Sequence, residues 1–234
     1  MNITPIATVH TPFKEKFGIP RQSVLIRYAE ALLTFNPPYD NPDAFTGLEG
    51  FSHLWLQFGF HKNIRDQFKP SVRPPRLGGN QSIGVFSTRS SFRPNSLGLS
   101  LVELQAIKID NGSVSLVISC PDLLDGTPIY DIKPYVEYSD RPTHPSCGFA
   151  DAAPEPVLDV AFASEAEDVI RNHPRLDECK QLDRFIEELI KQDPRPAYHQ
   201  ANKERTYRMR IFDLEIEWQV EQKTAHIIKV SKVS

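Results

Sequence analysis

The sequence predicts a mainly β protein, with an N-terminal β-barrel or sandwich followed by a small α+β unit. Three observations support this class. Apolar and polar residues alternate in several early segments, most clearly over 53–61, and a period of two is typical of strands with one buried face. The 20 prolines favour turns and extended backbone over a helical bundle. Helical spacing of apolar residues begins only near the C-terminus.

Further strands are expected along the first half of the chain. Residues 99–110 and 113–120 are two strands joined at Asn111-Gly112, a dipeptide that tolerates positive φ and favours a tight hairpin. The apolar phase slips at Ala106-Ile107, which indicates a bulge. Strands at this spacing favour a barrel or a sandwich. Shorter strands are expected at 3–10, 25–28 and 82–87.

A change in composition predicts a domain boundary. All 11 glycines precede residue 149, and 17 of the 20 prolines lie at or before Pro156. The proline-containing segment 151–156 therefore predicts a linker between residues 1–150 and 157–234. In the second part, Ser164-x-x-Glu167 predicts a capping box that opens a helix ending before Pro174. A second helix is expected from the apolar repeat over 182–190, and a hairpin from the alternation over 207–211 and 214–220.

Composition and missing motifs exclude several classes of function. A net charge of −3 excludes a globally basic protein, and no apolar run approaches the roughly 18 residues of a membrane span. Three widely spaced cysteines make no disulfide framework, so we expect a cytoplasmic protein. The absence of Gly-x-Gly excludes the glycine-rich loops of dinucleotide, Walker and Rossmann methyltransferase sites, and no Gly-x-Ser-x-Gly elbow is present. His144-x-x-Cys147 lacks a second ligand pair, so no metal is expected.

Two basic regions are candidate nucleic-acid contacts. Residues 62–93 hold seven basic side chains and one acid, a local charge of +6. Arginines and backbone N–H groups in proline- and glycine-rich loops suit phosphates, and Phe92 offers a stacking face, although a solvated basic loop is an equally good interpretation of the charge alone. A second basic stretch covers 195–210. A protein that binds a folded RNA needs two basic regions of this kind. The candidate RNA contacts are Arg73, Arg76, Arg93, Arg195, Arg205 and Arg208.

A third cluster lies in residues 121–135. Asp125-Gly126 is a turn signal, and Thr127 and Asp131 could present oxygens to a small polar ligand. A rigid connector between strands is the alternative interpretation.

These stretches together resemble a known family. The motifs are Phe13-Lys-Glu-Lys-Phe17 with Pro20-Arg21-Gln22, Gly47-Leu-Glu-Gly-Phe-Ser-His-Leu-Trp55, Arg73-Pro-Pro-Arg-Leu-Gly-Gly79, Gly84-Val-Phe-Ser-Thr-Arg-Ser-Ser-Phe-Arg-Pro-Asn95 and Asp125-Gly-Thr-Pro-Ile-Tyr-Asp-Ile-Lys-Pro-Tyr135. In this order they resemble the TrmO family, the TsaA-like β-barrel group of S-adenosylmethionine-dependent tRNA methyltransferases. The resemblance covers residues 3–140 closely, and 192–198 resembles the C-terminal domain of bacterial members.

The resemblance implies an antiparallel β-barrel that holds S-adenosylmethionine without a Rossmann fold, in a protein that is usually a homodimer. It implies methylation of N6 of N6-threonylcarbamoyladenosine, next to the anticodon of threonine tRNA. The family's donor contacts correspond here to Pro20, Arg21, Gln22, His61, Lys62, Arg89, Leu99, Asp125, Gly126, Thr127 and Pro128.

The expected chemistry needs no nucleophilic side chain and no metal. The methyl group arrives activated by the positive charge on sulfur, so the protein positions the reactants and excludes water. Leu99 and the Gly126 turn could hold the adenine, and Arg89 or Arg21 the donor's carboxylate. Asp131 or Tyr135 would serve as a weak base at the acceptor N6. Two alternatives stay open: a non-catalytic RNA-binding module, and a barrel methyltransferase with another substrate.

Overall fold

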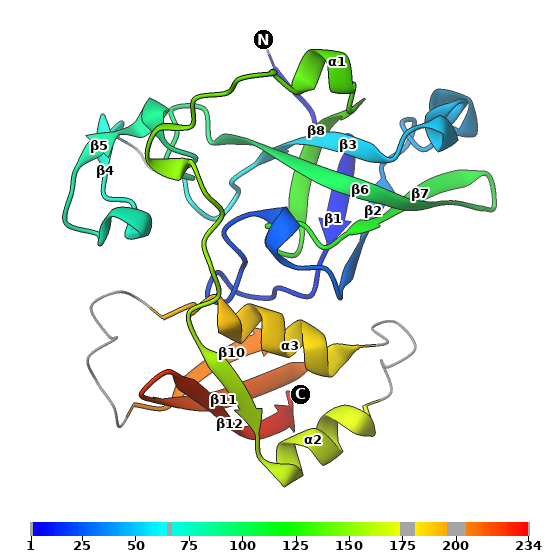
Figure 1. Ribbon diagram of the computed structural model, residues 1–234. Helices are drawn as coiled ribbons and strands as arrows, with labels where there is room; N and C mark the ends of the chain where they lie inside the picture. Colours follow the sequence, from blue (N-terminus) through cyan, green and yellow to red (C-terminus); the bar gives the residue numbers. More distant parts are fainter. Residues whose placement is uncertain (1, 65–66, 174–180, 196–204, 234) are drawn as a thin grey trace.

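The computed structural model describes residues 2–64, 67–173, 181–195 and 205–233. These residues form a six-stranded closed barrel and, beneath it, a four-stranded sheet with two helices (Figure 1). The connector after β8 runs down one side from the barrel to the lower sheet. The mainly β class and the N-terminal barrel are therefore confirmed.

The barrel closes in the order β1-β2-β7-β6-β3-β8, with every neighbouring pair antiparallel. Closure leaves the barrel without a free strand edge. A separate two-stranded sheet, β4 with β5, lies in the loop between β3 and β6. The strands are β1 Ala7–His10, β2 Glu30–Phe35, β3 His53–Gly59, β4 Ser71–Val72, β5 Ile83–Gly84, β6 Leu97–Asp110, β7 Ser113–Ser119 and β8 Thr127–Pro134.

Period-two alternation fills the barrel. Leu54, Leu56 and Phe58 of β3 are buried while the intervening side chains are partly or fully exposed, as expected from the sequence. The β6–β7 hairpin turns at Asn111-Gly112, where φ is 51° and 83°. The register of the pair shifts between Leu104 and Ala106, so a bulge lies within two residues of the expected place.

Two expectations for the barrel were wrong. The segment 25–28 is no strand: a 3-10 helix covers Ser23–Leu25, and the strand begins five residues later as β2. The segment 82–87 contains only the two-residue β5, followed by a 3-10 helix over Val85–Ser87. The other 3-10 helices and the one-turn α1 of the N-terminal part are Pro42–Phe45, Leu48–Gly50, Pro75–Leu77, Gly148–Ala150 and α1 Glu137–Asp140.

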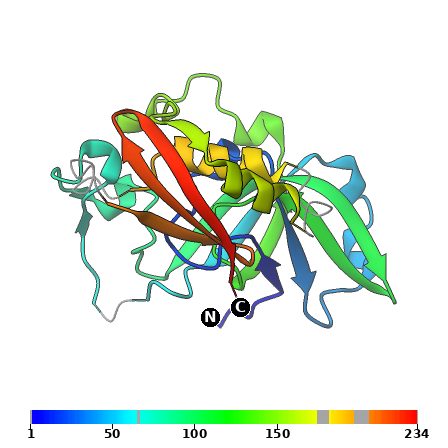
Figure 2. The ribbon, with the colours of Figure 1, turned by 90° about the horizontal axis from the view of Figure 1, so that it is seen from below.

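The lower sheet has the order β10-β11-β12-β9, with β9 parallel to β12. Its strands are β9 Asp159–Phe162, β10 Tyr207–Ile211, β11 Leu214–Glu221 and β12 Thr224–Lys232. The expected hairpin is present as β10–β11, and β9 and β12 extend it. In the view from below, this sheet lies in front of the barrel (Figure 2).

Two helices accompany this sheet, α2 Ser164–Arg171 and α3 Leu182–Lys191. Both match the expected helical patterns, but the capping box does not form. The N-cap is Ala163, and no side chain caps the helix. Buried α3 residues repeat at helical spacing, which gives the helix one apolar face. These residues are Leu182, Phe185, Ile186, Leu189 and Ile190.

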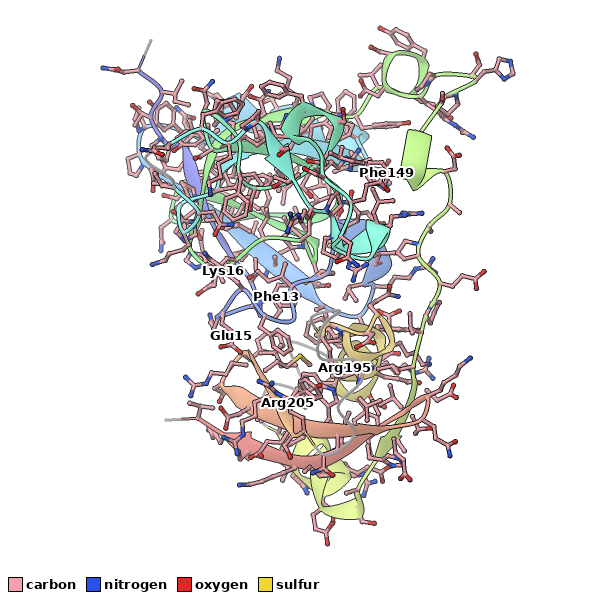
Figure 3. The ribbon with its side chains drawn as sticks, turned by 90° about the vertical axis from the view of Figure 1, so that its left-hand side faces the viewer. Phe13, Glu15, Lys16, Phe149, Arg195 and Arg205 are labelled. Carbon is pink, nitrogen blue, oxygen red and sulfur yellow. The ribbon has the colours of Figure 1, made fainter. Side chains whose placement is uncertain are left out.

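A hydrophobic core lies between the barrel and the lower sheet, separate from the core inside the barrel. Phe13, labelled at their junction in Figure 3, is fully buried and pairs by an isolated β-bridge with Ile211 of β10. Its ring lies 6.1 Å from that of Phe185 on α3. Phe17, Ile19 and Leu25 pack against the same core. The segment that contains Pro20, Arg21 and Gln22 is therefore anchored by both parts of the molecule.

Candidate functional site

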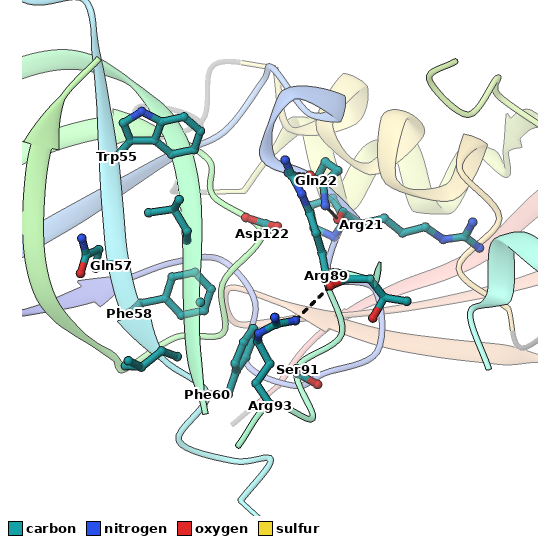
Figure 4. Close-up of a pocket in the computed structure, with 15 residues that line it drawn as sticks. Arg21, Gln22, Trp55, Gln57, Phe58, Phe60, Arg89, Ser91, Arg93 and Asp122 are labelled. Carbon is teal, nitrogen blue, oxygen red and sulfur yellow. Dashed lines mark hydrogen bonds between the residues drawn. The ribbon is translucent and has the colours of Figure 1, made fainter. Parts of the chain in front are cut away.

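Several segments of the sequence meet in a cavity of about 640 Å³ on the outside of the barrel (Figure 4). They are the loop around Gln22, the loop around Arg89, and the strands β3 and β6. Arg89 Nη1 donates a hydrogen bond to Gln22 Oε1, so the two loops are tied together. The lining residues are Pro20, Arg21, Gln22, Trp55, Gln57, Phe58, Phe60, Thr88, Arg89, Ser91, Arg93, Leu97, Gly98, Leu99 and Asp122.

The floor of this cavity depends on a glycine. Gly98 lies opposite Phe58 in the β3–β6 ladder. A Cβ atom on Gly98 would lie 2.2 Å from Cζ of the Phe58 ring, far inside van der Waals contact. Because only hydrogen fits there, Gly98 lets the Phe58 ring lie across β6, where it lines the cavity.

The loop that contains Pro20, Arg21 and Gln22 is attached to strand β6. Ser23 is buried, and its Oγ donates a 2.7 Å hydrogen bond to the Leu101 carbonyl of β6. Pro20 is buried, Gln22 is half-buried and Arg21 is exposed. Arg89 and Leu99 complete the set of expected donor contacts that line this cavity.

A second cavity of about 180 Å³ adjoins the first, and His61, Lys62 and Thr127 are among its lining residues. Burial and the positive charge of Lys62 lower the pKa of His61, so its imidazole is neutral at pH 7. Thr127 is buried and its Oγ1 donates to the Leu124 carbonyl at 2.6 Å, with Nδ1 of His61 3.5 Å away. The remaining lining residues are Lys16, Ile19, Phe58, Gly59, Phe60, Asn63, Asp122, Leu123 and Leu124.

Asp122 lines both cavities, and the sequence analysis missed it. It follows strand β7 and accepts a 2.5 Å hydrogen bond from Ser100 Oγ on β6. Burial raises the pKa of its carboxyl group, while Ser100 and the nearby Arg89 charge act in the opposite direction. Figure 4 shows Asp122 between the barrel side chains and the Gln22–Arg89 pair. Its position three residues before the Asp125 turn was the available signal.

The turn at 125–128 contributes less to the cavities than expected. Only Thr127 lines one, and Asp125, Gly126 and Pro128 line neither. The Asp125 carboxylate accepts from Thr11 N at 2.9 Å and from Lys14 Nζ at 2.7 Å. Asp125 therefore ties this turn to the segment that precedes the Gln22 loop. Gly126 supplies the positive φ of 75° that the turn needs.

The two expected bases lie at different places, Asp131 on β8 and Tyr135 directly after it. Asp131 pairs with Gln57, which in turn pairs with Leu99, so one cross-strand row leads from the first cavity to Asp131. Tyr135 lies four residues further, about 13 Å along an extended chain. It neighbours His53, and the two rings are 6.2 Å apart. One acceptor atom could not contact both groups.

The expected RNA contacts fall into two groups. Arg73, Arg76, Arg205 and Arg208 are exposed. Arg93 is half-buried, donates to the Thr88 carbonyl at 3.0 Å and lines the first cavity. Arg195, inside the lower part in Figure 3, is buried and forms a bidentate pair with Asp193 at 2.6 and 2.9 Å. In this structure its guanidinium serves the fold instead of facing RNA.

The described ranges contain neither a metal-binding cluster nor a helix that could span a membrane. Within them, no three His, Cys, Asp or Glu side chains are grouped as a metal site would require. No helix in the same ranges has the length and apolar character that crossing a membrane demands.

Comparison with known proteins covers nearly the whole chain. Residues 8–141 match the family described as tRNA-methyltransferase O N-terminal domain, and residues 155–233 match the TrmO C-terminal domain. A tRNA (adenine(37)-N6)-methyltransferase of Escherichia coli is 43% identical over 216 residues, which is 92% of this chain and 91% of that protein. A putative S-adenosylmethionine-dependent methyltransferase, RcsF of Pseudomonas aeruginosa, is 43% identical over 218 residues, 93% of this chain and 91% of the relative.

Similarity extends to a solved structure. The crystal structure of TrmO from Pseudomonas aeruginosa superimposes with a TM-score of 0.79 at 35% identity, over 99% of this chain and 98% of that one. With two family domains matched in order and a relative aligned over nine-tenths of both chains, the chain belongs to the TrmO family of tRNA methyltransferases.

Proposed function

We propose that this protein transfers the methyl group of S-adenosylmethionine to N6 of N6-threonylcarbamoyladenosine at position 37 of threonine tRNA. The observation that carries the proposal is the meeting of the expected donor contacts at two adjoining cavities. Pro20, Gln22, Arg89 and Leu99 line the first, and His61, Lys62 and Thr127 line the second. Family membership supports the tRNA substrate, since the relatives that align over most of this chain are named as methyltransferases.

The residues present fit such a donor. The donor is an elongated molecule with an apolar base, a carboxylate and positive charge at both sulfur and amine. Arg21 and Arg89 can pair with the carboxylate, Leu97 and Leu99 can cover the base, and Asp122 supplies negative charge. Bound S-adenosylmethionine supplies an electrophilic methyl group.

The protein's own groups position the reactants. Arg89 and Gln22 close the first cavity from the loop side, and Phe58 and Phe60 exclude water from its floor. The neutral imidazole of His61 adds no charge that would repel a cationic donor. Geometric alignment of donor and acceptor is the main contribution that such a site can make.

We propose Asp131 as the base that receives the N6 proton. It lies in the cross-strand row of Leu99 and Gln57, two residues that line the first cavity. Its carboxylate accepts from the backbone N–H of Ile132 at 3.0 Å, which leaves oxygen lone pairs for a proton. Tyr135, the other predicted base, lies four residues further along the chain, next to His53. Replacing Asp131 with Asn should lower kcat and leave donor affinity unchanged, and Tyr135→Phe should change neither.

We also propose a division of labour between residues 1–150, which bind the donor, and residues 157–234, which contact tRNA. The exposed Arg73 and Arg76 on the barrel side and Arg205 and Arg208 on the lower part would face phosphates. Replacing Arg205 and Arg208 of the lower part together with Glu should weaken tRNA binding and lower the salt dependence of that binding by about one to two phosphate contacts. Donor affinity should be unchanged.

A homodimer in the cytoplasm is part of the same proposal. The closed barrel has no free strand edge, so two subunits cannot associate by pairing barrel strands edge to edge. In the lower sheet, strand β9 is an edge strand, whereas the edge of β10 is already bonded to residues 12–15. Light scattering of the purified protein at micromolar concentration gives the mass directly, and a mass of 26.6 kDa would contradict the dimer.

The test of the function is nucleoside mass spectrometry after incubation of the protein with S-adenosylmethionine and threonine tRNA. We expect one added methyl on the threonylcarbamoylated adenosine and little transfer to the same tRNA lacking that modification. No transfer, together with no donor binding by calorimetry, would contradict the proposal. Binding of tRNA without binding of the donor would favour a non-catalytic RNA-binding module. Donor binding without transfer to tRNA would favour another acceptor.

A further inference from the structure

The two cavities share three lining residues, Phe58, Phe60 and Asp122. We propose that the Asp122 carboxylate, together with the two phenylalanine rings, holds the positively charged sulfur of the methyl donor at this junction. The inference rests on the proposed function and assigns the polarity of its donor site.

The shape of the donor points to this position. Its sulfur joins the adenosyl half to the amino acid half, so it lies in the middle of the molecule. With one end in the 640 Å³ cavity and the other in the 180 Å³ cavity, the sulfur lies where the cavities meet. The residues common to both cavities are then the residues around the sulfur.

The charge distribution singles out Asp122. Among the described residues that line either cavity, it is the only acid. A donor that carries two positive charges has no other side-chain carboxylate in these walls. The basic lining residues are Lys16, Arg21, Lys62, Arg89 and Arg93.

The Asp122 carboxylate is also prepared for a cation. Ser100 Oγ fixes one carboxylate oxygen, and no ion pair to Asp122 is formed within the described ranges. Burial raises the pKa of Asp122, so the ionised form is unfavourable until a positive charge arrives beside it. By contrast, Asp125 of the nearby turn already pairs with Lys14.

The aromatic rings complete the site. Phe58 and Phe60 meet edge to face, with 4.9 Å between ring centroids. Aromatic faces attract cations, most strongly where water is excluded. Two rings and one carboxylate therefore form a small region of negative potential between walls that are otherwise basic.

The experiment compares S-adenosylmethionine with S-adenosylhomocysteine by titration calorimetry at pH 7.5. The two ligands share the adenosine and the amino acid, and they differ in the charge on sulfur. We expect Asp122→Asn to weaken S-adenosylmethionine about tenfold or more and S-adenosylhomocysteine less than about threefold. Phe60→Leu should show the same selectivity with a loss of several-fold.

The matched control is Asp40→Asn. Asp40 also accepts a serine hydroxyl, from Ser113 at 2.8 Å, but it lies outside both cavities. This variant should bind both ligands as the unaltered protein does.

Three results would overturn the inference. Equal losses for both ligands in Asp122→Asn would place Asp122 on a part that they share, such as a ribose hydroxyl. Unchanged affinity for both would remove Asp122 from the site. If Asp122→Asn does not fold, equal losses of affinity for both ligands in Phe60→Leu would overturn the inference. In these cases the unaltered protein still binds the donor, and the proposed function stands. Failure of the unaltered protein to bind S-adenosylmethionine would overturn both.

Discussion

Gly98 offers a sharp test of how the barrel shapes the cavity, through the substitution Gly98→Ala. The added methyl group would lie 2.2 Å from Cζ, 2.5 Å from Cε2 and 2.8 Å from Cε1 of the Phe58 ring. Carbon atoms prefer separations of about 3.5–4.0 Å, so the ring or the strand must move by more than about 1 Å. The ring is a rigid group within the barrel core, and no flexible chain end can yield.

The expected magnitude follows from overpacking. Inserting a methyl group into a filled core costs about 1–3 kcal/mol. Phe58 can relieve part of this strain by moving into the adjoining cavity. The displaced ring then occupies space that the donor needs, so donor affinity falls. We expect the loss of unfolding free energy and the loss of donor binding free energy to sum to about 1–3 kcal/mol. If all of it appeared in binding, affinity would fall about 5- to 150-fold.

Urea unfolding and titration with S-adenosylmethionine measure the two parts. The control is Gly50→Ala, because a Cβ at Gly50 meets nothing within 4 Å. We expect little change in either measurement for this control. If Gly98→Ala leaves both stability and donor affinity within about 0.3 kcal/mol of the unaltered protein, the proposed role of Phe58 in shaping the cavity is refuted.

The remaining predictions concern charged groups. Arg89→Ala removes the contact to Gln22 and a basic group of the first cavity, so donor affinity measured by calorimetry should fall at least tenfold. The melting temperature should stay within a few degrees of that of the unaltered protein. Unchanged donor affinity would argue against this cavity as the donor site. Arg195→Ala should remove two hydrogen bonds and the opposite charge from the buried Asp193 carboxylate and destabilise the protein by about 3–5 kcal/mol in urea, whereas a purely RNA-binding arginine would leave stability unchanged. Because burial raises the pKa of Asp122 in the folded state, its contribution to stability is complete below the unfolded value and is lost as pH rises through the folded value. The melting temperature of Asp122→Asn relative to the unaltered protein should therefore increase from pH 4 to pH 8, and a constant difference would contradict the raised pKa.

Local patterns were enough to find the elements in which one face is buried. The alternation in β3 and the Asn111-Gly112 turn predicted a strand and a hairpin that the structure contains. Strand β2 was missed because Leu32, on its partly exposed face, blurs the alternation of Ala31, Leu33 and Phe35. Strand β8 was missed because Pro128 and Pro134 bracket it, and its residues were interpreted only as a ligand-binding turn.

The site was predictable where motifs lie in one loop and unpredictable where it depends on distant partners. The Gln22 and Arg89 segments were identified from sequence, and the structure brings them together. The hydrogen bonds that Thr11 and Lys14 donate to Asp125 join residues more than 100 positions apart in the sequence. The position of Asp122 between two cavities likewise arises from packing of the folded barrel, which no local pattern encodes.

A crystal structure of the protein with S-adenosylmethionine tests the central claim most directly. We expect the adenosyl and amino acid ends in the two adjoining cavities, with the sulfur beside Asp122 and Phe60 and the Gln22 and Arg89 loops in contact with the ligand. Density for the ligand outside these two cavities, or on a face of the barrel remote from Arg89, would contradict it.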